Sequence, residues 1–358
     1  MSKDIFVFAE QRSGAVQKVS LELIGEAARL AADLGEQVVA VLMGYQVADK
    51  APLLCQYGAE KVLVVDHPVL EHYTTEPYVK AMEYIIRTYD PNVVLYGASS
   101  IGRDMAPRVA GRVHTGLTAD CTRLDVDVEK YQAYLRRASQ IPAERIDSLD
   151  KTDRNLKMTR PAFGGNVMAT IICPEYRPQM ATVRPGVMEM PERNPDAVGE
   201  IVMVDAGLSM EDRNVEILEV VRSGKKAVDI TDAKILVSGG RGVGGPEGYE
   251  PLRELAAVLG GEVSSSRIGV DSGWIEKDRQ VGQTGKTVHP DLYIACGISG
   301  AIQHLAGMES SECIIAINTD ENCPMMKIAD LGIVGDLKVI IPKLTEAIKA
   351  YRAEQRID

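Results

Sequence analysis

Short, almost continuously apolar runs alternate with amphipathic stretches along this chain, and that alternation narrows its possible folds more than any other feature. The runs IFVFAE (5–10) and NVVLYGAS (92–99) have the length of strands but lack a polar face. Such strands must be covered on both sides, which is typical of a parallel sheet between two layers of helices. After the first run, apolar residues recur at helical spacing from Val16 to Leu34, and Gly35 then supplies a helix stop. This part of the chain therefore predicts strands and helices in alternation around a parallel sheet.

The pattern changes beyond residue 117, where further strands are expected between turn residues. The segments 117–129, 166–176 and 179–190 have the composition of strands. Residues 131–157 are more polar and charged, which indicates a surface insertion or a hairpin. Residues 211–222 (EDRNVEILEVVR) predict the last strand of this region.

A polar segment, SGKKAVDITD (223–232), is the expected hinge to a second α/β region. Strands are expected there at 233–238 and 291–297. We therefore predict an α/β fold with two domains. An N-terminal doubly wound, mostly parallel sheet domain covers 1–222, and a C-terminal Rossmann-like α/β domain covers 233–358.

Composition removes several classes of function. The chain has 358 residues, 45% of them hydrophobic, and a formal net charge of -11. This charge argues against a nucleic-acid binder, which needs a basic face to neutralise phosphates. No apolar run approaches the roughly 18 residues that span a bilayer, so no direct membrane insertion is expected. The N-terminus lacks the apolar core of a signal peptide.

The six cysteines form no CxxC pair, and the five histidines lack the spacing of a zinc site. We expect buried, reduced thiols and no bound metal. Together with the absence of an export signal, reduced thiols predict a cytoplasmic location.

The first candidate ligand-binding segment is 240–245 (GRGVGG), which follows a strand and precedes a helix. Glycines there let a phosphate approach the backbone, and the helix N–H groups then face the anion. The pattern also fits a nicotinamide dinucleotide loop, although Arg241 lies in its middle. The acidic residue about 20 positions on, Glu262, does not clearly end a strand. A tight strand–helix turn with an exposed arginine is the alternative.

Two further segments carry small and polar residues. In 280–287 (QVGQTGKT), two glycines bracket a polar pair, so the backbone can come close to a planar ring or a diphosphate. An ordinary surface loop is the alternative there. In 296–304 (CGISGAIQH), a buried strand ends in small residues before a helix. His304 in this segment is either a core histidine or a polar contact to a ligand carbonyl.

The fourth segment is 316–320 (AINTD), and Asp336 follows the next strand. Asn and Asp at strand ends suit ribose or phosphate recognition, though they are also common in turns. Because the carboxyl ends of parallel strands meet at one edge of a sheet, the four segments together predict a dinucleotide site.

The motifs SGAIQHLAGM, QVGQTGK and AIN, together with GGRG and IADLGIVGDL, resemble the alpha subunit of electron-transfer flavoproteins over about residues 230–342. The N-terminal half resembles the same family more loosely, through FVFAE and NVVLYGAS. The resemblance implies a heterodimer with a beta subunit. FAD would lie in the C-terminal domain, and the N-terminal domain would pack against the beta subunit.

The resemblance also implies roles for individual residues. Arg241 would lie against the flavin ring, and Ser266 would donate near its reactive edge with Arg267 beside it. The ring and the diphosphate would be wrapped by Val281, Gly282, Gln283 and Thr284. The phosphates and the pyrimidine edge would be held by Ser299, Gly300, Ala301, Ile302, Gln303 and His304, and the adenosine end by Asn318, Asp336 and Leu337. Arg241 and His304 would stabilise negative charge added to the flavin.

Within the family, the segment TRPAFGGN (159–166) and the extra length at 131–157 look more like members that bifurcate electrons. Those members pair with a beta subunit that binds a second FAD and NADH, and Arg160 would then approach that flavin. Simple relay from an acyl-CoA dehydrogenase, with one FAD plus AMP, is the alternative within the family. In either case the chain is expected to be an electron-carrier subunit. An NAD-dependent dehydrogenase and a cofactor-free structural subunit are the alternatives outside it.

Overall fold

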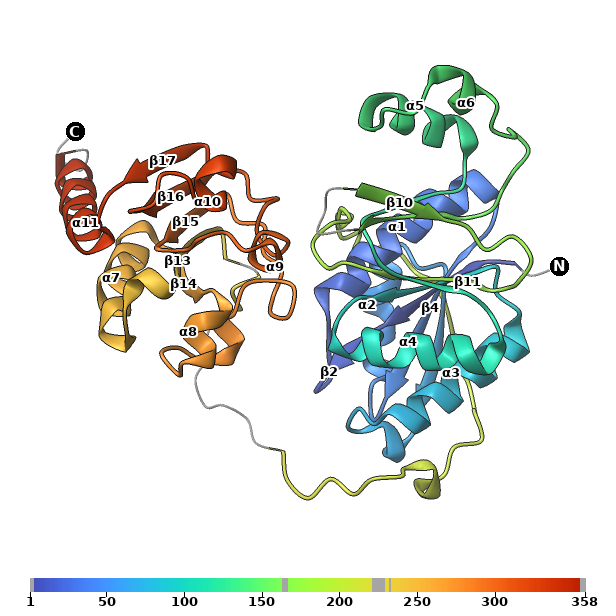
Figure 1. Cartoon of the computed structure of the whole chain (residues 1–358). Helices are drawn as coiled ribbons and strands as arrows, with labels where there is room; N and C mark the ends of the chain where they lie inside the picture. The colour runs from blue at the N-terminus through green and yellow to red at the C-terminus, as the bar shows by residue number, and fades with distance from the viewer. Residues whose placement is uncertain (1–2, 163–166, 221–228, 232, 355–358) are drawn as a thin grey trace. The chain divides into compact units, whose positions relative to one another are not determined.

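The computed structural model of the chain describes residues 3–162, 167–220, 229–231 and 233–354. Its internal contacts divide the chain into two compact units, Met1–Val220 and Val221–Asp358, which are described separately here (Figure 1). Of the expected hinge, residues 223–228 and 232 lie outside the described part. No helix in the described part of the chain is long and apolar enough to cross a membrane.

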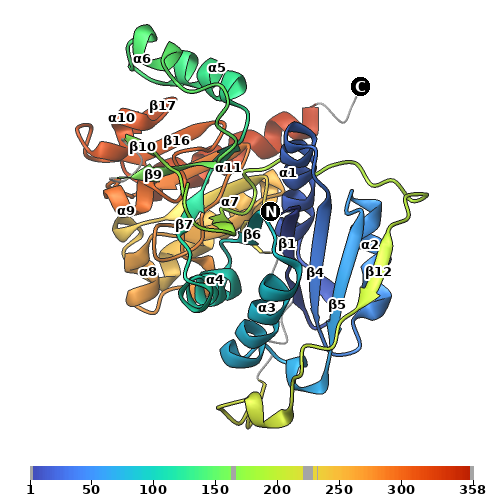
Figure 2. The ribbon, with the colours of Figure 1, turned by 90° about the vertical axis from the view of Figure 1, so that its right-hand side faces the viewer.

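The first unit is built on a sheet of seven strands, and every neighbouring pair in it is parallel. Figure 2 shows four of them, β1, β4, β5 and β12, side by side. The strand β1 lies in the interior. The chain adds strands β4 and β5 on one side of it, then β6, β7 and β11 on the other, and returns to the first side with β12. The order across the sheet is β12 (Glu200–Met203), β5 (Lys61–Asp66), β4 (Val38–Gly44), β1 (Ile5–Ala9), β6 (Val93–Gly97), β11 (Gln179–Val183) and β7 (Leu117–Cys121).

Successive residues of β1 enter two different cores, as the absence of a polar face predicts. Ile5, Val7 and Ala9 pack into the core that contains helices α1 (Lys18–Leu34) and α2 (Ala51–Gln56). Phe6 and Phe8 pack on the opposite face against α3 (Thr75–Tyr89) and α4 (Ser100–Val113). Gly35 ends α1 in the left-handed conformation, with a φ of 69°, and donates its N–H to Ala31.

In a sheet of this order the crevice between β1 and β6 is where a ligand usually binds. In this unit the residue that directly follows β1 at that crevice is Glu10, which is 1% exposed. Its carboxylate accepts hydrogen bonds from Ser99 Oγ and from Arg12 Nε, the latter at 3.0 Å. Ser99 in turn caps α4 by accepting from the Gly102 N–H. Arg12 belongs to a hairpin of two short strands, β2 (Gln11–Arg12) and β3 (Ala15–Val16).

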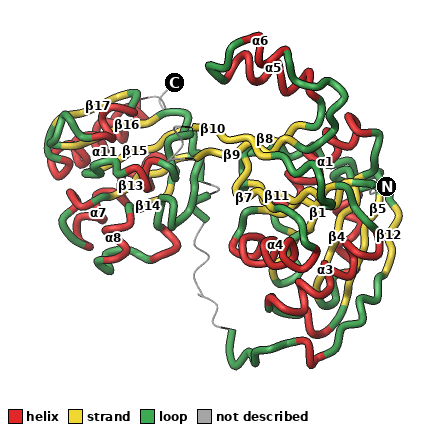
Figure 3. The backbone as a smooth tube through the Cα atoms, turned by 45° about the vertical axis from the view of Figure 1, so that its right-hand side comes forward, coloured by secondary structure: helices red, strands yellow, loops and turns green. Residues whose placement is uncertain are grey.

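A smaller antiparallel sheet lies beside the main one, with the order β10 (Val167–Ile171), β9 (Lys157–Ala162) and β8 (Arg123–Asp125). The polar segment 131–157 forms the helix α6 (Ala143–Asp147) and most of α5 (Val128–Ala138), so it is a helical insertion rather than a strand hairpin. These helices share a small apolar cluster of their own and stand away from the sheet (Figure 3).

The strand expected at 211–222 is wrong for the residues that are described. Residues Met210–Asp212 form a single helical turn, and 213–220 form no strand. The last strand of the unit is β12, which occupies the sheet edge beside β5. Residues 215–220 are mostly apolar and rich in Val and Ile, but they pair with no sheet among the described residues, and Leu218 is 88% exposed.

The second unit contains a five-stranded parallel sheet. Its order is β14 (Glu262–Ser265), β13 (Ile235–Gly239), β15 (Leu292–Cys296), β16 (Ile314–Asn318) and β17 (Leu331–Val334). Helices α7 (Tyr249–Leu259) and α11 (Leu337–Glu354) cover one face (Figure 1). Three short helices join the later strands: α8 (Arg267–Asp271), α9 (Ile302–Leu305) and α10 (Pro324–Ile328). Both units therefore confirm the predicted α/β class with parallel sheets.

Strand order also locates the crevice of the second unit. The chain leaves β13 toward β14 on one side and then returns to β15 on the other side. At such a reversal, the two connections diverge at the carboxyl ends of the strands and leave an opening between them. A ligand site is therefore expected where β13 and β15 end.

The left-handed end of α1 can be tested with a matched pair of glycines. Gly35→Ala should lower the free energy of unfolding of the first unit by about 1 kcal/mol, because a Cβ is disfavoured at positive φ. Gly111→Ala, inside α4, should raise it by roughly 0.5–1 kcal/mol because alanine favours the helix. An added Cβ meets no atom within 4 Å at either site. Urea unfolding followed by circular dichroism measures both, and equal shifts would contradict the assignment.

Candidate cofactor-binding site

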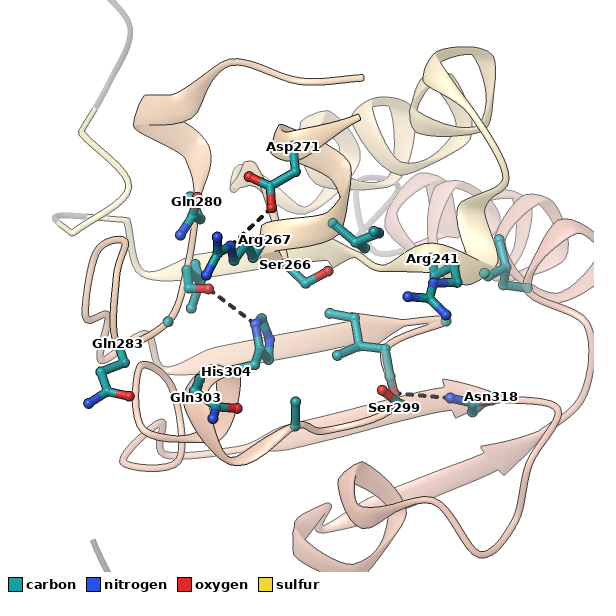
Figure 4. Close-up of a pocket in the computed structure, with 18 of the residues that line it drawn as sticks. Arg241, Ser266, Arg267, Asp271, Gln280, Gln283, Ser299, Gln303, His304 and Asn318 are labelled. Carbon is teal, nitrogen blue, oxygen red and sulfur yellow. Dashed lines mark hydrogen bonds and ion pairs between the residues drawn. The ribbon is translucent and has the colours of Figure 1, made fainter. Parts of the chain in front are cut away.

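A cavity of about 710 Å³ lies at the carboxyl ends of all five strands of the second unit (Figure 4). Pockets for small ligands and cofactors have volumes of roughly 300–1,000 Å³. Each strand contributes the turn that follows it: Arg241 and Gly242 after β13, Ser266 after β14, Ile298 and Ser299 after β15, Asn318 and Thr319 after β16, and Gly335 and Asp336 after β17.

Two glycine turns touch each other at the centre of this site. The Gly242 N–H donates to the Gly297 carbonyl at 3.1 Å. A Cβ on Gly242 would lie 2.8 Å from the Gly297 Cα, and one on Gly240 would lie 2.4 Å from the Gly297 carbonyl oxygen. Gly297 itself has a φ of 62°, which favours glycine. Only residues without a Cβ let the two turns come this close.

Beyond Gly297, four successive backbone N–H groups are left out of the hydrogen bonding of the sheet. The N–H groups of Ile298, Ser299, Gly300 and Ala301 donate to no acceptor among the described residues. All of these residues except Gly300 line the cavity. Successive backbone N–H groups without a protein partner form a concave site that attracts anions. The turn after β15 is therefore suited to a phosphate or a diphosphate.

The segment 280–287 is held on two sides and does not behave as an ordinary surface loop. Val281 donates its N–H to the Ser265 carbonyl at 2.9 Å, and Gln283 donates to the Gln303 carbonyl at 2.7 Å. Gly282 has a φ of 138°, and a Cβ there would lie 2.9 Å from the Gln303 carbonyl oxygen. The segment therefore forms a fixed wall of the cavity between β14 and α9.

His304 lines the cavity, yet its ring is 6% exposed and both ring nitrogens have protein partners. Nδ1 lies 3.2 Å from the Val281 carbonyl oxygen, a contact drawn in Figure 4, and Nε2 lies 3.0 Å from the Tyr293 hydroxyl. Burial lowers the pKa of His304 to about 4, and the hydrogen bond to Val281 offsets part of that effect. The ring is therefore uncharged at neutral pH.

Positive and donor groups lie along the same cavity. Arg241 is exposed and forms no ion pair with any residue of the described chain. Arg267 pairs with Asp271, one turn away on α8, at 3.0 Å. The Ser266 hydroxyl points into the cavity in Figure 4. Arg241 thus offers an uncompensated positive charge, whereas the charge of Arg267 is balanced locally.

The polar residues after β16 and β17 also stabilise their own turns. Asn318 donates from Nδ2 to the Ile298 carbonyl at 3.0 Å. Asp336 accepts from the Lys338 N–H at 2.9 Å at the start of α11. These contacts match the alternative in which Asn and Asp form turns.

The structure brings most of the predicted site residues into one cavity lining. Those that line it are Arg241, Ser266, Arg267, Val281, Gly282, Gln283, Thr284, Ser299, Ala301, Gln303, His304, Asn318, Asp336 and Leu337. Gly300 and Ile302 do not line it. A Cβ on Gly300 would lie 2.4 Å from the Met325 nitrogen, so this glycine serves packing against α10. The Ile302 side chain is 60% exposed.

Five further lining residues belong to the predicted ligand segments without having been given a role, namely Gly242, Gln280, Gly297, Ile298 and Thr319. Gly335, beside the predicted Asp336, was missed. Ile268 and Asp271 also line the cavity, and Asp271 is four residues after Arg267 on the same helix. Helical spacing of opposite charges was the signal available for Asp271.

The geometry disfavours a nicotinamide dinucleotide in the expected manner. In such a site an acidic residue at the carboxyl end of the second strand binds the ribose. Here Glu262 begins β14 instead of ending it, and its carboxylate pairs with Arg279 at 2.7 Å. Glu262 does not line the cavity.

The lowered pKa of His304 predicts a pH dependence of stability. The unfolded histidine, with a pKa near its ordinary 6.5, binds a proton at a higher pH than the folded ring, whose pKa is about 4. As the pH is lowered from 6.5 to 4, the free energy of unfolding of the second unit should therefore fall, by at most about 1.4 kcal/mol per pH unit. Urea unfolding followed by the fluorescence of Trp274, the single tryptophan, measures it. His304→Gln should remove this contribution, and identical slopes for both proteins would contradict it.

The contact between the glycine turns can be tested in the same way. Gly242→Ala should destabilise the second unit by about 1–3 kcal/mol, because its Cβ would press on backbone that cannot move aside easily. Gly245→Ala is the matched control, since its backbone is extended and an added Cβ meets nothing within 4 Å. A Gly242→Ala protein as stable as the control would show that the turns can separate at no cost.

Comparison with known proteins matches both units. Residues 5–209 match the model of the electron transfer flavoprotein domain, and residues 229–309 match that of the electron transfer flavoprotein FAD-binding domain. The electron transfer flavoprotein subunit alpha of Thermoanaerobacterium thermosaccharolyticum is 51% identical over 98% of this chain and 99% of its own length. The acryloyl-CoA reductase electron transfer subunit beta of Anaerotignum propionicum is 48% identical over 97% of this chain and 96% of its own.

A third relative is the lactate dehydrogenase (NAD(+),ferredoxin) subunit LctC of Acetobacterium woodii. It is 40% identical over 97% of this chain and 77% of its own length. Taken together, the two domain matches and the full-length identities show that this chain belongs to the alpha-subunit family of electron transfer flavoproteins.

Proposed function

We propose that this chain is the FAD-containing subunit of a heterodimeric electron-transfer flavoprotein and that FAD binds along the strand ends of its second unit. The observation that carries the proposal is the run of unpaired N–H groups at 298–301, on the floor of a cavity of about 710 Å³. This run lies within the segment that matches the FAD-binding domain.

The residues present fit the chemistry of a dinucleotide. The N–H groups after Gly297 would donate hydrogen bonds to the diphosphate, and the close contact of Gly242 with Gly297 keeps side chains out of its path. Asn318, Asp336 and Leu337, at the ends of β16 and β17, would receive the adenosine end.

The flavin would lie between the first two strand ends and the 280–287 wall. A bound flavin supplies the group that takes up and releases electrons. Arg241 would place an unbalanced positive charge beside it, and Ser266 would donate a hydrogen bond from the end of β14. Val281 to Thr284 and the ring of His304 would enclose it and exclude water. Positive charge and donors in a buried site favour added electrons.

We further propose that the complex works in NADH-dependent electron bifurcation with an acyl-CoA dehydrogenase as electron partner. Two relatives support this, one being an electron transfer subunit of acryloyl-CoA reductase and the other a subunit of a lactate dehydrogenase (NAD(+),ferredoxin). The beta subunit would then hold a second FAD, and a cytoplasmic location fits the six free cysteines. Residues 223–232 would act as the hinge between donor and acceptor positions of the second unit.

Arg160 is the residue of the first unit proposed to approach the second flavin. It lies in β9, near the Asp120 carboxylate, which forms ion pairs with Arg103 and Arg184. Burial alone would raise the pKa of Asp120, but the hydrogen bond from Arg184 and the charges of Arg184, Arg103 and Arg160 lower it below its usual value. One carboxylate among several guanidinium groups leaves net positive charge, which suits an anionic partner.

Flavin content of the purified complex tests the proposal. The chain with its beta subunit should be yellow, and Arg241→Ala should weaken FAD binding by about tenfold or more, since hydrogen bonds to charged groups contribute about 1.5–3 kcal/mol. Arg253→Ala is the control, because Arg253 lies on α7 outside the cavity and pairs with Glu250. Fluorescence of FAD released from the two variants at graded concentrations provides the measurement.

The number of nucleotides decides between the two modes of action. Two FAD per heterodimer would support bifurcation, and one FAD plus AMP would support simple relay. A colourless complex that binds NADH instead would overturn the flavin assignment in favour of a dehydrogenase. A complex without any bound nucleotide would leave a structural subunit.

A further inference from the structure

Both ring nitrogens of His304 form hydrogen bonds with groups of the protein. The Val281 carbonyl oxygen can only accept, so the proton of the uncharged ring is on Nδ1. Nε2 then carries the lone pair, and the Tyr293 hydroxyl must donate to it. Neither nitrogen is left to point into the cavity that the ring lines.

Tyr293 is buried where no water reaches its hydroxyl. Its side chain is fully buried on the face of β15 that packs against α9 and the 280–288 segment. Ser238 on β13 and Ser264 on β14 face the same side and are also fully buried. Neither serine hydroxyl has a hydrogen-bond partner among the described residues. Burial raises the pKa of Tyr293 far above its ordinary value, so the phenol keeps its proton.

The direction of donation follows from this arrangement. Tyr293 has one hydroxyl proton, and its hydrogen bond to His304 Nε2 uses it. Inside a protein such a hydrogen bond is electrostatically stronger than in water. A buried hydroxyl that donates to Nε2 opposes the arrival of a proton at that nitrogen.

We propose that Tyr293 is a positioning residue that fixes the orientation and the uncharged state of the His304 ring, and through it sets how readily the cofactor accepts an electron. This inference rests on the proposed function, because it takes FAD to be the occupant of the cavity. Among the described residues the hydroxyl of Tyr293 hydrogen-bonds only to the histidine, and Tyr293 does not line the cavity, so any effect on the cofactor passes through His304.

Charged groups near the ring do not account for the uncharged state of His304. Arg267 and Asp271, on α8, are paired at 3.0 Å, and Lys286, at the 280–287 wall, is paired with Asp229 at 2.9 Å. Arg241 lies after β13, at the other end of the labelled residues from Gln283 in Figure 4. The groups that contact the nitrogens of His304 are thus the carbonyl and the phenol, both uncharged.

The sheet supplies a matched control. Tyr249 is also fully buried, but it lies on the opposite face, where its hydroxyl bonds to Ser265 Oγ at 2.6 Å and to the Gly239 carbonyl. Tyr293→Phe and Tyr249→Phe each remove one buried hydroxyl from the same sheet, and only the first loses a partner of His304.

The test compares these two variants with the unmodified heterodimer. In Tyr293→Phe the equilibrium for adding an electron to bound FAD should shift about fivefold toward the reduced form, the equivalent of one hydrogen bond of about 1 kcal/mol. Spectroelectrochemical titration measures it. Nuclear magnetic resonance of isotope-labelled histidine should show that His304 Nε2 loses its hydrogen-bonded signature and that the ring gains a proton at a higher pH. Tyr249→Phe should match the unmodified protein in both measurements.

Equal shifts in the two variants, or none in Tyr293→Phe, would overturn the inference. Should Tyr293→Phe fold poorly, the ring-nitrogen signals of His304 in the unmodified protein decide: an Nε2 without a hydrogen-bonded signature would overturn the inference. If the complex binds no FAD, the proposed function fails on its own. The ring-nitrogen signals of His304 in the full chain then still decide whether Tyr293 positions the ring.

Discussion

The second unit depends on a contact between two stretches of backbone, the turns that follow β13 and β15. Because Gly242 and Gly297 lack side chains, these turns meet at van der Waals distance and share a hydrogen bond of 3.1 Å. The contact closes the floor of the crevice that the strand order opens. The residues that follow Gly297 have backbone N–H groups without an acceptor in the described part of the chain, and most of them line the cavity. Arg241 and His304 line the same cavity.

Much of the fold could be predicted because its strands are apolar on both faces. That property is a direct consequence of helices on either side of a parallel sheet, so it appears in the residue pattern itself, as in β1 with its alternating partners. The failed strand at 211–222 shows the limit of this signal. A composition rich in Val and Ile indicates that a segment is able to form a strand, whereas pairing with a sheet decides whether it does. The position beside β5 is taken by β12. The helices within 131–157 were hidden because their apolar contact is small and local.

The site was predictable to the extent that it lies at strand ends, since parallel strands end at a common edge. Its precise chemistry was not. The partners of His304 come from Tyr293 and Val281, 11 and 23 residues away, and neither spacing is one that a sequence pattern reports. Likewise, the packing role of Gly300 against α10 depends on a segment that follows it by more than 20 residues. Sequence reasoning placed these residues in the right region, while tertiary contacts determine what each atom is free to do.

The two units of the chain share the same kind of sheet but treat its crevice in opposite ways. In the second unit the crevice is lined with unpaired donors, whereas in the first it is closed by the buried carboxylate of Glu10 with Ser99 and Arg12. A phosphate at the ends of β1 and β6 would be repelled by the Glu10 carboxylate. The Ser99 and Arg12 donors nearby already hydrogen-bond to that carboxylate. One sheet topology therefore carries opposite charge preferences: its crevice position holds a buried carboxylate in the first unit and free backbone donors in the second.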